Sequence, residues 1–232
     1  MDYLKNLNEE QYKAVTHLEG PCLVLAGAGS GKTRVLTTRI AYLIDQGIPS
    51  YNILAITFTN KAAKEMKERL ESLVPDNKAF VGTFHSLGVR IIRENCTLCN
   101  LTSTFTILDS DDVLSLIKRI MKDKGIDPKM LAPSYVRNRI SFIKNENLSQ
   151  REITNLFNTA MEQQVLNIYE TYEELIHKNN SVDFDDLLVL PVKLFKEHQE
   201  VLDHYQEKFK YILVDEYQDT NEVQYQFNKL LA

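Results

Sequence analysis

Three glycines, a lysine and a threonine occur close together near the start of the chain, directly after the apolar run Cys22–Leu25. Glycine permits backbone angles that a side chain forbids, so the N–H groups of such a loop can converge on phosphate oxygens. Lysine adds a cation for β- and γ-phosphates, and threonine a hydroxyl for Mg²⁺. The spacing is that of a nucleotide-binding P-loop, which predicts contacts to ATP from Ala26, Gly27, Ala28, Gly29, Ser30, Gly31, Lys32 and Thr33.

Two adjacent carboxylates, Asp215 and Glu216, end the apolar run 211–214. Ligands of open parallel sheets bind outside the carboxyl ends of the strands. Asp215 is therefore expected to hold Mg²⁺ together with Thr33, and Glu216 to orient and deprotonate an attacking water. An acidic pair is weak evidence alone. With a P-loop upstream, it predicts ATP hydrolysis.

Strand-like and helical patterns alternate around these residues. We expect strands over 21–26, 53–59, 79–83 and 211–215, with a short one at 105–108, and no strong strand between 108 and 211. Helices are expected over 8–18, from the P-loop to Gly47, over 60–73 and from 83 to 94. This alternation predicts an α/β fold with a parallel sheet, as in P-loop NTPases.

The alternation stops after residue 108, and helical patterns follow over 110–124, 134–145, 149–155 and 159–179. We therefore expect residues 1–108 and 183–232 to form one core, interrupted by a helical subdomain over 109–182. Residues 118–151 contain nine basic and three acidic residues, which gives a net charge of +6. This surface is either merely solvated or a patch that faces phosphates. Its basic residues are Lys118, Arg119, Lys122, Lys124, Lys129, Arg137, Arg139, Lys144 and Arg151.

The composition excludes several classes of protein. There is no apolar run long enough for a membrane span, and the polar, acidic N-terminus argues against a signal peptide, so a cytoplasmic protein is expected. Cys96 and Cys99 form a C-x-x-C pair without the second pair that would complete a zinc site. The net charge of −5 means that any nucleic-acid surface must be local.

Six blocks, taken together, resemble the amino-terminal part of superfamily 1 DNA helicases of the UvrD/Rep/PcrA group, most of all the PcrA type. They occur in the order of that family. The blocks are Leu7–Gln11 (Q motif), Ala26–Arg34 (motif I), Thr57–Ala63 (motif Ia), Gly82–Ser86, Asp183–Leu188 and Val214–Asn221 (motif II).

The resemblance implies roles on the nucleotide side. Gln11 would contact the adenine edge, although its spacing from Asn8 fits a helix capping box equally well. Arg34 would stack on the base, or is simply a solvated residue of the first helical turn. Gln218 would join the catalytic set of Lys32, Asp215 and Glu216, and would couple the ATP site to neighbouring motifs.

The resemblance also implies a DNA-binding set. Phe58 would stack on a base of single-stranded DNA, or is a core residue of its strand. His85 by itself reads as a loop histidine, but its block favours DNA. The other expected contacts to phosphates or bases are Thr59, Asn60, Lys61, Thr83, Phe84 and Ser86.

By resemblance, the function is that of a 3′–5′ helicase and translocase, which acts on single strands and single-strand/duplex junctions in DNA repair or replication. The chain ends at Ala232, shortly after motif II. The later motifs and the second RecA-like core are not in it, so residues 1–108 and 183–232 would form an incomplete first RecA-like core. We expect nucleotide binding without efficient turnover. The alternatives are the helicase half of a helicase–nuclease, or a nucleotide- or DNA-binding module without productive turnover.

Overall fold

The computed structural model describes residues 2–27, 29–146 and 148–232. Ala28, a predicted nucleotide-binding residue, lies outside the described residues. The described chain forms two compact units. Unit 1 comprises the residues up to Phe84, Asp203–Asp219 and Leu231–Ala232; unit 2 comprises His85–Leu202 and Thr220–Leu230. The boundaries expected at 109 and 182 both lie inside unit 2, and the predicted division into core and inserted subdomain stays a prediction.

A parallel sheet forms the centre of unit 1. In the described residues it has the strand order β2-β1-β5, made of β1 (Ile53–Thr57), β2 (Phe80–Thr83) and β5 (Tyr211–Val214). Leu54 pairs with Phe80 on one side and with Ile212 on the other. Every residue of β1 is buried, as expected for the central strand of a covered parallel sheet. The predicted α/β class with a parallel sheet is confirmed.

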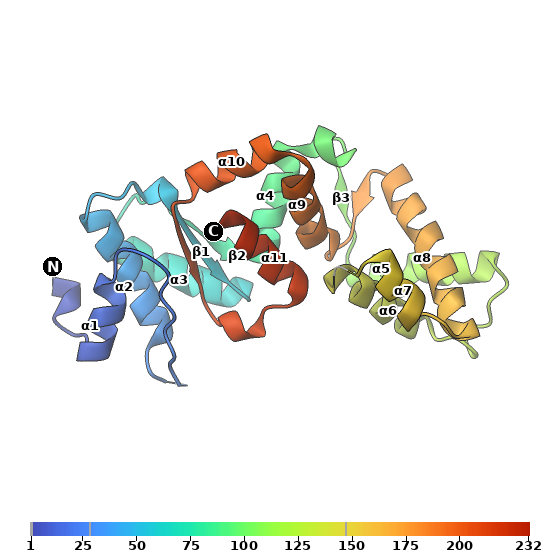
Figure 1. Cartoon of the computed structure of the whole chain (residues 1–232), viewed down its shortest axis with the longest axis horizontal. Helices are drawn as coiled ribbons and strands as arrows, with labels where there is room; N and C mark the ends of the chain where they lie inside the picture. Colours follow the sequence, from blue (N-terminus) through green and yellow to red (C-terminus); the bar gives the residue numbers. More distant parts are fainter. Residues whose placement is uncertain (1, 28, 147) are drawn as a thin grey trace. The chain divides into compact units, whose positions relative to one another are not determined.

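Helices α2 (Lys32–Asp45) and α3 (Asn60–Leu73) share a core with this sheet (Figure 1). Ile40 and Leu43 of α2 meet Met66 and Leu70 of α3 and Ile53 of β1, all at most 1% exposed. Helix α1 (Glu9–Thr16) packs on α2, and a 3₁₀ turn precedes it at Asp2–Leu4. Further 3₁₀ turns lie at Ser50–Asn52 and Tyr217–Asp219.

The strand expected over residues 21–26 is wrong. These residues, all of them described, form no strand, and Leu23 and Leu25 are 75% and 88% exposed. A strand exists only where a neighbour completes its backbone hydrogen bonds. The apolar run suits a strand, but none of the strand pairings in the described part of the chain includes it. The P-loop therefore follows an irregular, exposed segment.

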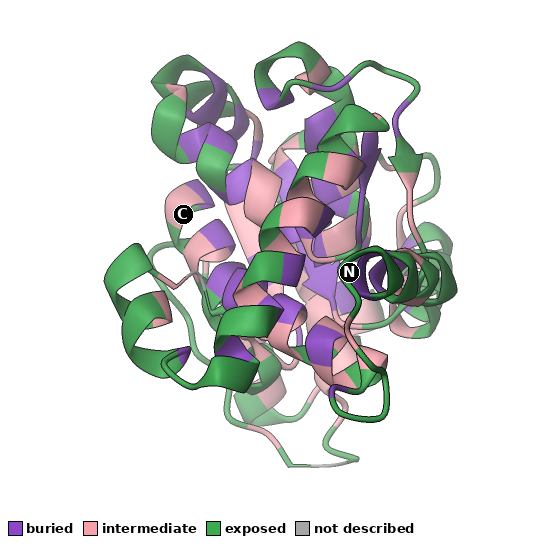
Figure 2. Ribbon diagram, turned by 90° about the vertical axis from the view of Figure 1, so that its right-hand side faces the viewer, coloured by how far each residue is buried: buried purple, intermediate pink, exposed green. Residues whose placement is uncertain are grey.

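Unit 2 is mainly helical. Helices α5 (Ser110–Asp123), α6 (Pro133–Asn145), α7 (Gln150–Leu156) and α8 (Ala160–Lys178) match the four expected helices closely. Side chains from this group bury one another, among them Ile117, Ile140, Phe157 and Tyr172, each at most 2% exposed. Figure 2 colours the buried residues of the chain purple. Ser149 and Thr159 cap α7 and α8, which explains why the helix starts were readable from sequence.

The remaining elements of unit 2 were harder to predict from the sequence. The two-residue strand β4 (Ser181–Val182) pairs in parallel with β3 (Thr106–Ile107), in a region where no strong strand was expected. Two residues are too few for an alternating pattern to show. The other helices are α4 (Phe84–Glu94), α9 (Asp186–Glu197) and α11 (Glu222–Leu231), with α10 (Gln199–Lys208) divided between the units and a 3₁₀ turn at Cys96–Cys99.

Candidate active site

The P-loop ends at the N-terminus of α2. Gly29 and Gly31 have φ values of 76° and 85°, in the left-handed region that glycine adopts without strain. Gly31 is the N-cap of α2 and makes no side-chain cap, so the first N–H groups of the helix have no side-chain acceptor there. Such N–H groups and the positive end of the helix favour an anion. Lys32 and Thr33 are the first two residues of that helix.

The predicted catalytic residues Lys32, Glu216 and Gln218 lie together in unit 1. The Lys32 Nζ atom is 3.1 Å from Glu216 Oε1, and Gln218 Nε2 donates a hydrogen bond of 2.6 Å to Glu216 Oε2. The Gln218 hydrogen bond, followed by the Lys32 ammonium, lowers the pKa of Glu216. The backbone of Glu216 has a φ of 48°, an unusual conformation for a residue with a side chain. The carboxylate is thus ionised and held in one orientation.

Asp215 directly follows β5 and is 8% exposed. Burial, followed by the charge of Glu216, raises the pKa of Asp215, while the Glu216 N–H that donates to its Oδ1 at 3.0 Å opposes the rise. Asp215 and Thr33 offer a carboxylate and a hydroxyl, the hard oxygen ligands that Mg²⁺ prefers. The donor set therefore fits the expected metal.

Gln11 makes the expected capping box and also touches the P-loop. Asn8 Oδ1 accepts from the Gln11 N–H at 2.8 Å, and Gln11 Oε1 accepts from the Asn8 N–H at 3.1 Å. Gln11 Nε2 then donates to the Ser30 carbonyl at 2.9 Å. The amide thus ties α1 to the P-loop, and its contact with adenine stays a prediction. Arg34 is exposed, which is compatible with both interpretations of that residue.

The predicted DNA-binding residues of unit 1 divide by exposure. Thr59 is exposed and caps α3 by accepting from the Ala62 N–H at 3.1 Å. Phe58 is half-buried, and its ring makes an edge contact with Phe84 at 5.8 Å. Two predicted residues are buried, Thr83 at 6% and Phe84 at 3% exposure, whereas Asn60 and Lys61 are exposed in the first turn of α3.

The predicted DNA-binding residues of unit 2 lie at the start of α4. The His85 ring is 5.5 Å from the ring of Phe184, which is 54% exposed. Burial lowers the pKa of His85, with the charge of Asp185 opposing, so the imidazole is neutral at pH 7. Ser86 is exposed. Phe184 was not predicted from the sequence as a DNA-binding residue. The signal that could have indicated it is an aromatic residue flanked by two aspartates.

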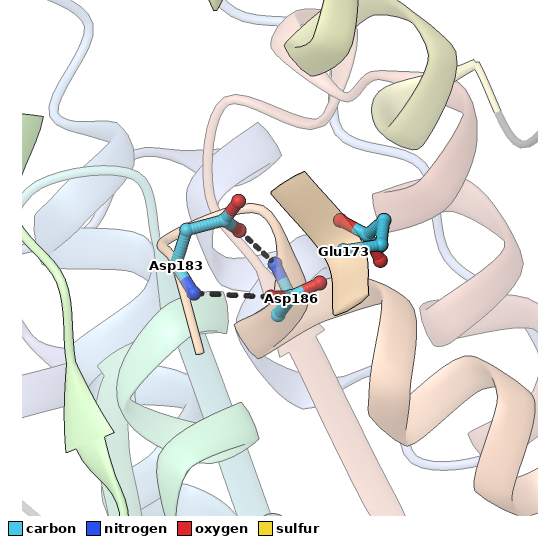
Figure 3. Close-up of side chains that lie close together, drawn as sticks. All are labelled: Glu173, Asp183 and Asp186. Atoms are coloured by element: carbon cyan, nitrogen blue, oxygen red, sulfur yellow. Dashed lines mark hydrogen bonds between the residues drawn. The ribbon is translucent and has the colours of Figure 1, made fainter. Parts of the chain in front are cut away.

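Lys144 does not belong to the basic surface predicted for residues 118–151. Its side chain is 2% exposed, and its Nζ lies 2.7 Å from Glu173 Oε1 and 2.8 Å from both Asp183 Oδ2 and Asp186 Oδ1. The contact with Glu173 is an ion pair without hydrogen-bond geometry. Figure 3 shows these three carboxylates close together, with Asp183 and Asp186 joined by reciprocal hydrogen bonds.

Arg139 is partly buried, with 23% of its side chain exposed. Its Nε is 3.2 Å from Glu162 Oε2, and its guanidinium lies over the Phe157 ring at 4.2 Å. The signal missed for Lys144 was helical periodicity, because it follows Val136 and Ile140 at the spacing of the buried face of α6. The predicted patch is therefore wrong for Lys144, and for Arg139 it stays a prediction.

The buried acids around Lys144 have divergent pKa values. Burial raises the pKa of Asp186 to about 7, with the charges of Asp183 and Glu173 adding to the rise and that of Lys144 opposing it. Burial acts in the same direction on Asp183, but the Lys144 charge and the hydrogen bonds to Asp183 prevail and lower its pKa. The ammonium of Lys144 occupies the place where three such carboxylates could otherwise hold a metal ion. The cluster is an internal ion-pair network.

Comparisons with known proteins agree with the six sequence blocks. A family model described as the UvrD/REP helicase N-terminal domain matches residues 7–232. The chain is 48% identical over 232 residues to the ATP-dependent DNA helicase PcrA of Staphylococcus epidermidis, and 47% identical over 240 residues to that of Bacillus subtilis. These matches cover 99% and 100% of this chain but 32% of each relative, so the chain spans 32% of the length of these curated relatives. The resemblance is confirmed, and the chain belongs to the UvrD/REP helicase N-terminal domain family.

Proposed function

We propose that this chain is the ATP-binding part of a DNA helicase that moves 3′ to 5′ on single-stranded DNA and unwinds duplexes by hydrolysing ATP. The observation that carries the proposal is the contact between the Lys32 ammonium of the P-loop and the Glu216 carboxylate. In this proposal Lys32 is the cation for the γ-phosphate and Glu216 is the base for water, and their contact supports a shared site. The relatives are ATP-dependent DNA helicases, which supports the proposal.

In this proposal each residue of the site has a defined task. The N–H groups of the P-loop and of α2 cradle the phosphates, and Lys32 neutralises the β- and γ-phosphate charge. Thr33 and Asp215 would hold Mg²⁺, which would stabilise the negative charge of the phosphates. Glu216 takes a proton from the attacking water, and Gln218 keeps the Glu216 carboxylate oriented. Gln11 and Arg34 contact the base.

Single-stranded DNA would contact the half-buried and exposed residues of the predicted DNA-binding set. Phe58 and the neighbouring first turn of α3, with Asn60 and Lys61, offer an aromatic face and a helix N-terminus for a base and a phosphate. Exposed Phe184 beside His85 offers a second aromatic face. Thr83 and Phe84 are buried, and Phe84 would support the ring of Phe58 through their edge contact.

The wider predictions remain part of the proposal. Residues 1–232 alone would bind nucleotide without efficient turnover, because transition-state contacts from outside this chain are needed. A cytoplasmic role in DNA repair or replication, with protein partners from those processes, is also proposed. None of the described helices is long and apolar enough to cross a membrane. A helicase–nuclease and a non-hydrolysing binding module remain the alternatives.

The test is Lys32→Ala in the full-length protein. Lys64→Ala, at an exposed position of α3, is the matched control. ATP hydrolysis is measured with and without oligo(dT), alongside binding of a fluorescent ATP analogue to residues 1–232. Loss of hydrolysis and of nucleotide binding in Lys32→Ala alone is the expected result. Undiminished turnover in that variant would refute the P-loop assignment, and turnover that DNA leaves unchanged in the wild type would favour a non-helicase role.

A further inference from the structure

The side-chain amide of Asn145, the last residue of α6, joins separate segments of unit 2. Its Nδ2 donates to Asp185 Oδ1 at 2.8 Å and to the Ser141 carbonyl at 2.9 Å. Its Oδ1 accepts from Asn221 Nδ2 at 2.9 Å. Asn221 lies 76 residues from Asn145 in the chain, and Asp185 lies 40 residues from it. The result is a continuous chain of hydrogen bonds, Asn221–Asn145–Asp185.

Both partners of Asn145 stand at helix starts. Asp185 is the N-cap residue of α9. Asn221 directly precedes α11 and caps it, since Asn221 Oδ1 accepts from the Gln224 N–H at 2.9 Å and the Asn221 N–H donates to Gln224 Oε1 at 3.1 Å. A shift of either helix start must therefore lengthen or break a hydrogen bond to Asn145, since these bonds weaken steeply with distance and angle.

One end of this chain of hydrogen bonds lies close in sequence to the proposed ATP site, and the other end lies next to the proposed DNA-binding surface. Asn221 follows the proposed base Glu216 by five residues in motif II. Asp185 directly follows Phe184, whose exposed ring lies beside His85. Neighbouring contacts hold this end firmly: a Cβ atom on Gly88 of α4 would lie 1.8 Å from the Leu187 carbonyl oxygen of α9.

Lys144 also holds the Asp183–Asp186 segment in place. Lys144 binds Asp183 and Asp186 while Asn145 binds Asp185, so two consecutive residues of α6 hold all three carboxylates of the Asp183–Asp186 segment. Phe184 is the residue of that segment that remains exposed. The carboxylates thus act as anchors, and the aromatic ring is the group presented to solvent.

We propose that Asn145 is a positioning residue that couples motif II to the Phe184–His85 surface, so that DNA bound there changes the rate of ATP hydrolysis. This inference rests on the proposed function. A displacement of the segment after Glu216 is transmitted through Asn221 and Asn145 to Asp185, and from there to the adjacent Phe184. In the opposite direction, DNA bound at Phe184 acts on the adjacent Asp185 and, through the same hydrogen bonds, on the segment after Glu216.

The experiment uses the full-length protein and compares ATP turnover with and without oligo(dT). Asn145→Asp places a carboxylate against Asp185, and Asn145→Asp/Asp185→Asn restores a hydrogen bond with donor and acceptor exchanged. Asn138→Asp, at an exposed position of the same helix, is the matched control. Residues along a coupling network modulate coupling by about 0.5–2 kcal/mol, so DNA stimulation should fall roughly 2- to 30-fold in Asn145→Asp. Basal turnover should be unchanged, and the double variant should recover the stimulation.

Asn221→Asp covers the case in which Asn145→Asp fails to fold. It keeps the oxygen that caps α11 but cannot donate to Asn145, so it too should lower DNA stimulation. Wild-type stimulation in Asn145→Asp or in Asn221→Asp would overturn the inference. A wild-type protein that DNA does not stimulate would instead refute the proposed function, so the two failures are distinguishable.

Discussion

Lys32 and Glu216, which are 184 residues apart in the chain, form an ion pair with 3.1 Å between Nζ and Oε1. A γ-phosphate that reached Lys32 would compete with Glu216 for the same ammonium. Displaced from Lys32, the Glu216 carboxylate would keep its hydrogen bond from Gln218 and could accept a proton from water. The ion pair therefore connects phosphate binding with exposure of the proposed base.

Glu216→Gln should separate nucleotide binding from hydrolysis. The amide cannot take a proton from water, so turnover should fall by about 10²–10⁴-fold, the usual contribution of general-base catalysis. Nucleotide affinity should equal or exceed that of the wild type, because the competing anion at Lys32 is removed. Turnover of the full-length protein and titration of a fluorescent ATP analogue measure the two effects. Glu65→Gln, at an exposed position of α3, is the control. An equal loss of nucleotide binding and turnover in Glu216→Gln would make Glu216 a structural residue.

Phe58→Ala should weaken the binding of single-stranded DNA by about 1–3 kcal/mol, the contribution of one stacked base. The measurement is fluorescence anisotropy with labelled oligo(dT). Tyr51→Ala removes an aromatic side chain that is 57% exposed in the same unit and should leave the affinity unchanged. Because Phe58 also contacts Phe84, circular dichroism must show that the variant is folded. Unchanged affinity in a folded Phe58→Ala would identify Phe58 as a core residue.

Neutralising the exposed lysines Lys118, Lys122 and Lys129 should flatten the salt dependence of duplex binding. Each phosphate contact that is lost should reduce the slope of log K against log salt concentration by about 0.9. Arg139→Gln should leave the slope unchanged, because Arg139 is paired with Glu162 inside the helical group. A triple variant with the wild-type slope would show that the surface is only solvated.

Lys144→Met should lower the free energy of unfolding of residues 1–232 by roughly 3–5 kcal/mol, because it leaves buried carboxylates without their cation. Urea denaturation followed by circular dichroism measures the loss. Lys122→Met, at an exposed position of α5, should change stability by no more than about 0.5 kcal/mol. Equal, small effects of both substitutions would show that the cluster is not a stabilising network.

Much of the fold could be read from local pattern. The helix starts at Asn8, Ser149 and Thr159 follow from capping side chains three residues from their partners, and the structure places α1, α7 and α8 there. The parallel sheet follows from the alternation of strands and helices. Local pattern could not show whether residues 21–26 form a strand. A strand needs a neighbouring strand for its backbone hydrogen bonds, and the residues of the segment itself do not specify that neighbour.

The sequence by itself determined the P-loop, its lysine and threonine, the acidic pair after β5 and the family, because each depends on residue types at short, fixed spacings. The tertiary structure alone decided that Lys32 meets Glu216, that Phe84 is buried while Phe184 is exposed, and that Lys144 is neutralised inside unit 2. Two of the partners of Lys144, Asp183 and Asp186, lie 39 and 42 residues away in the chain. The physical reason is that burial and ion pairing depend on which segments the fold brings together, whereas caps and periodicity act within a few residues.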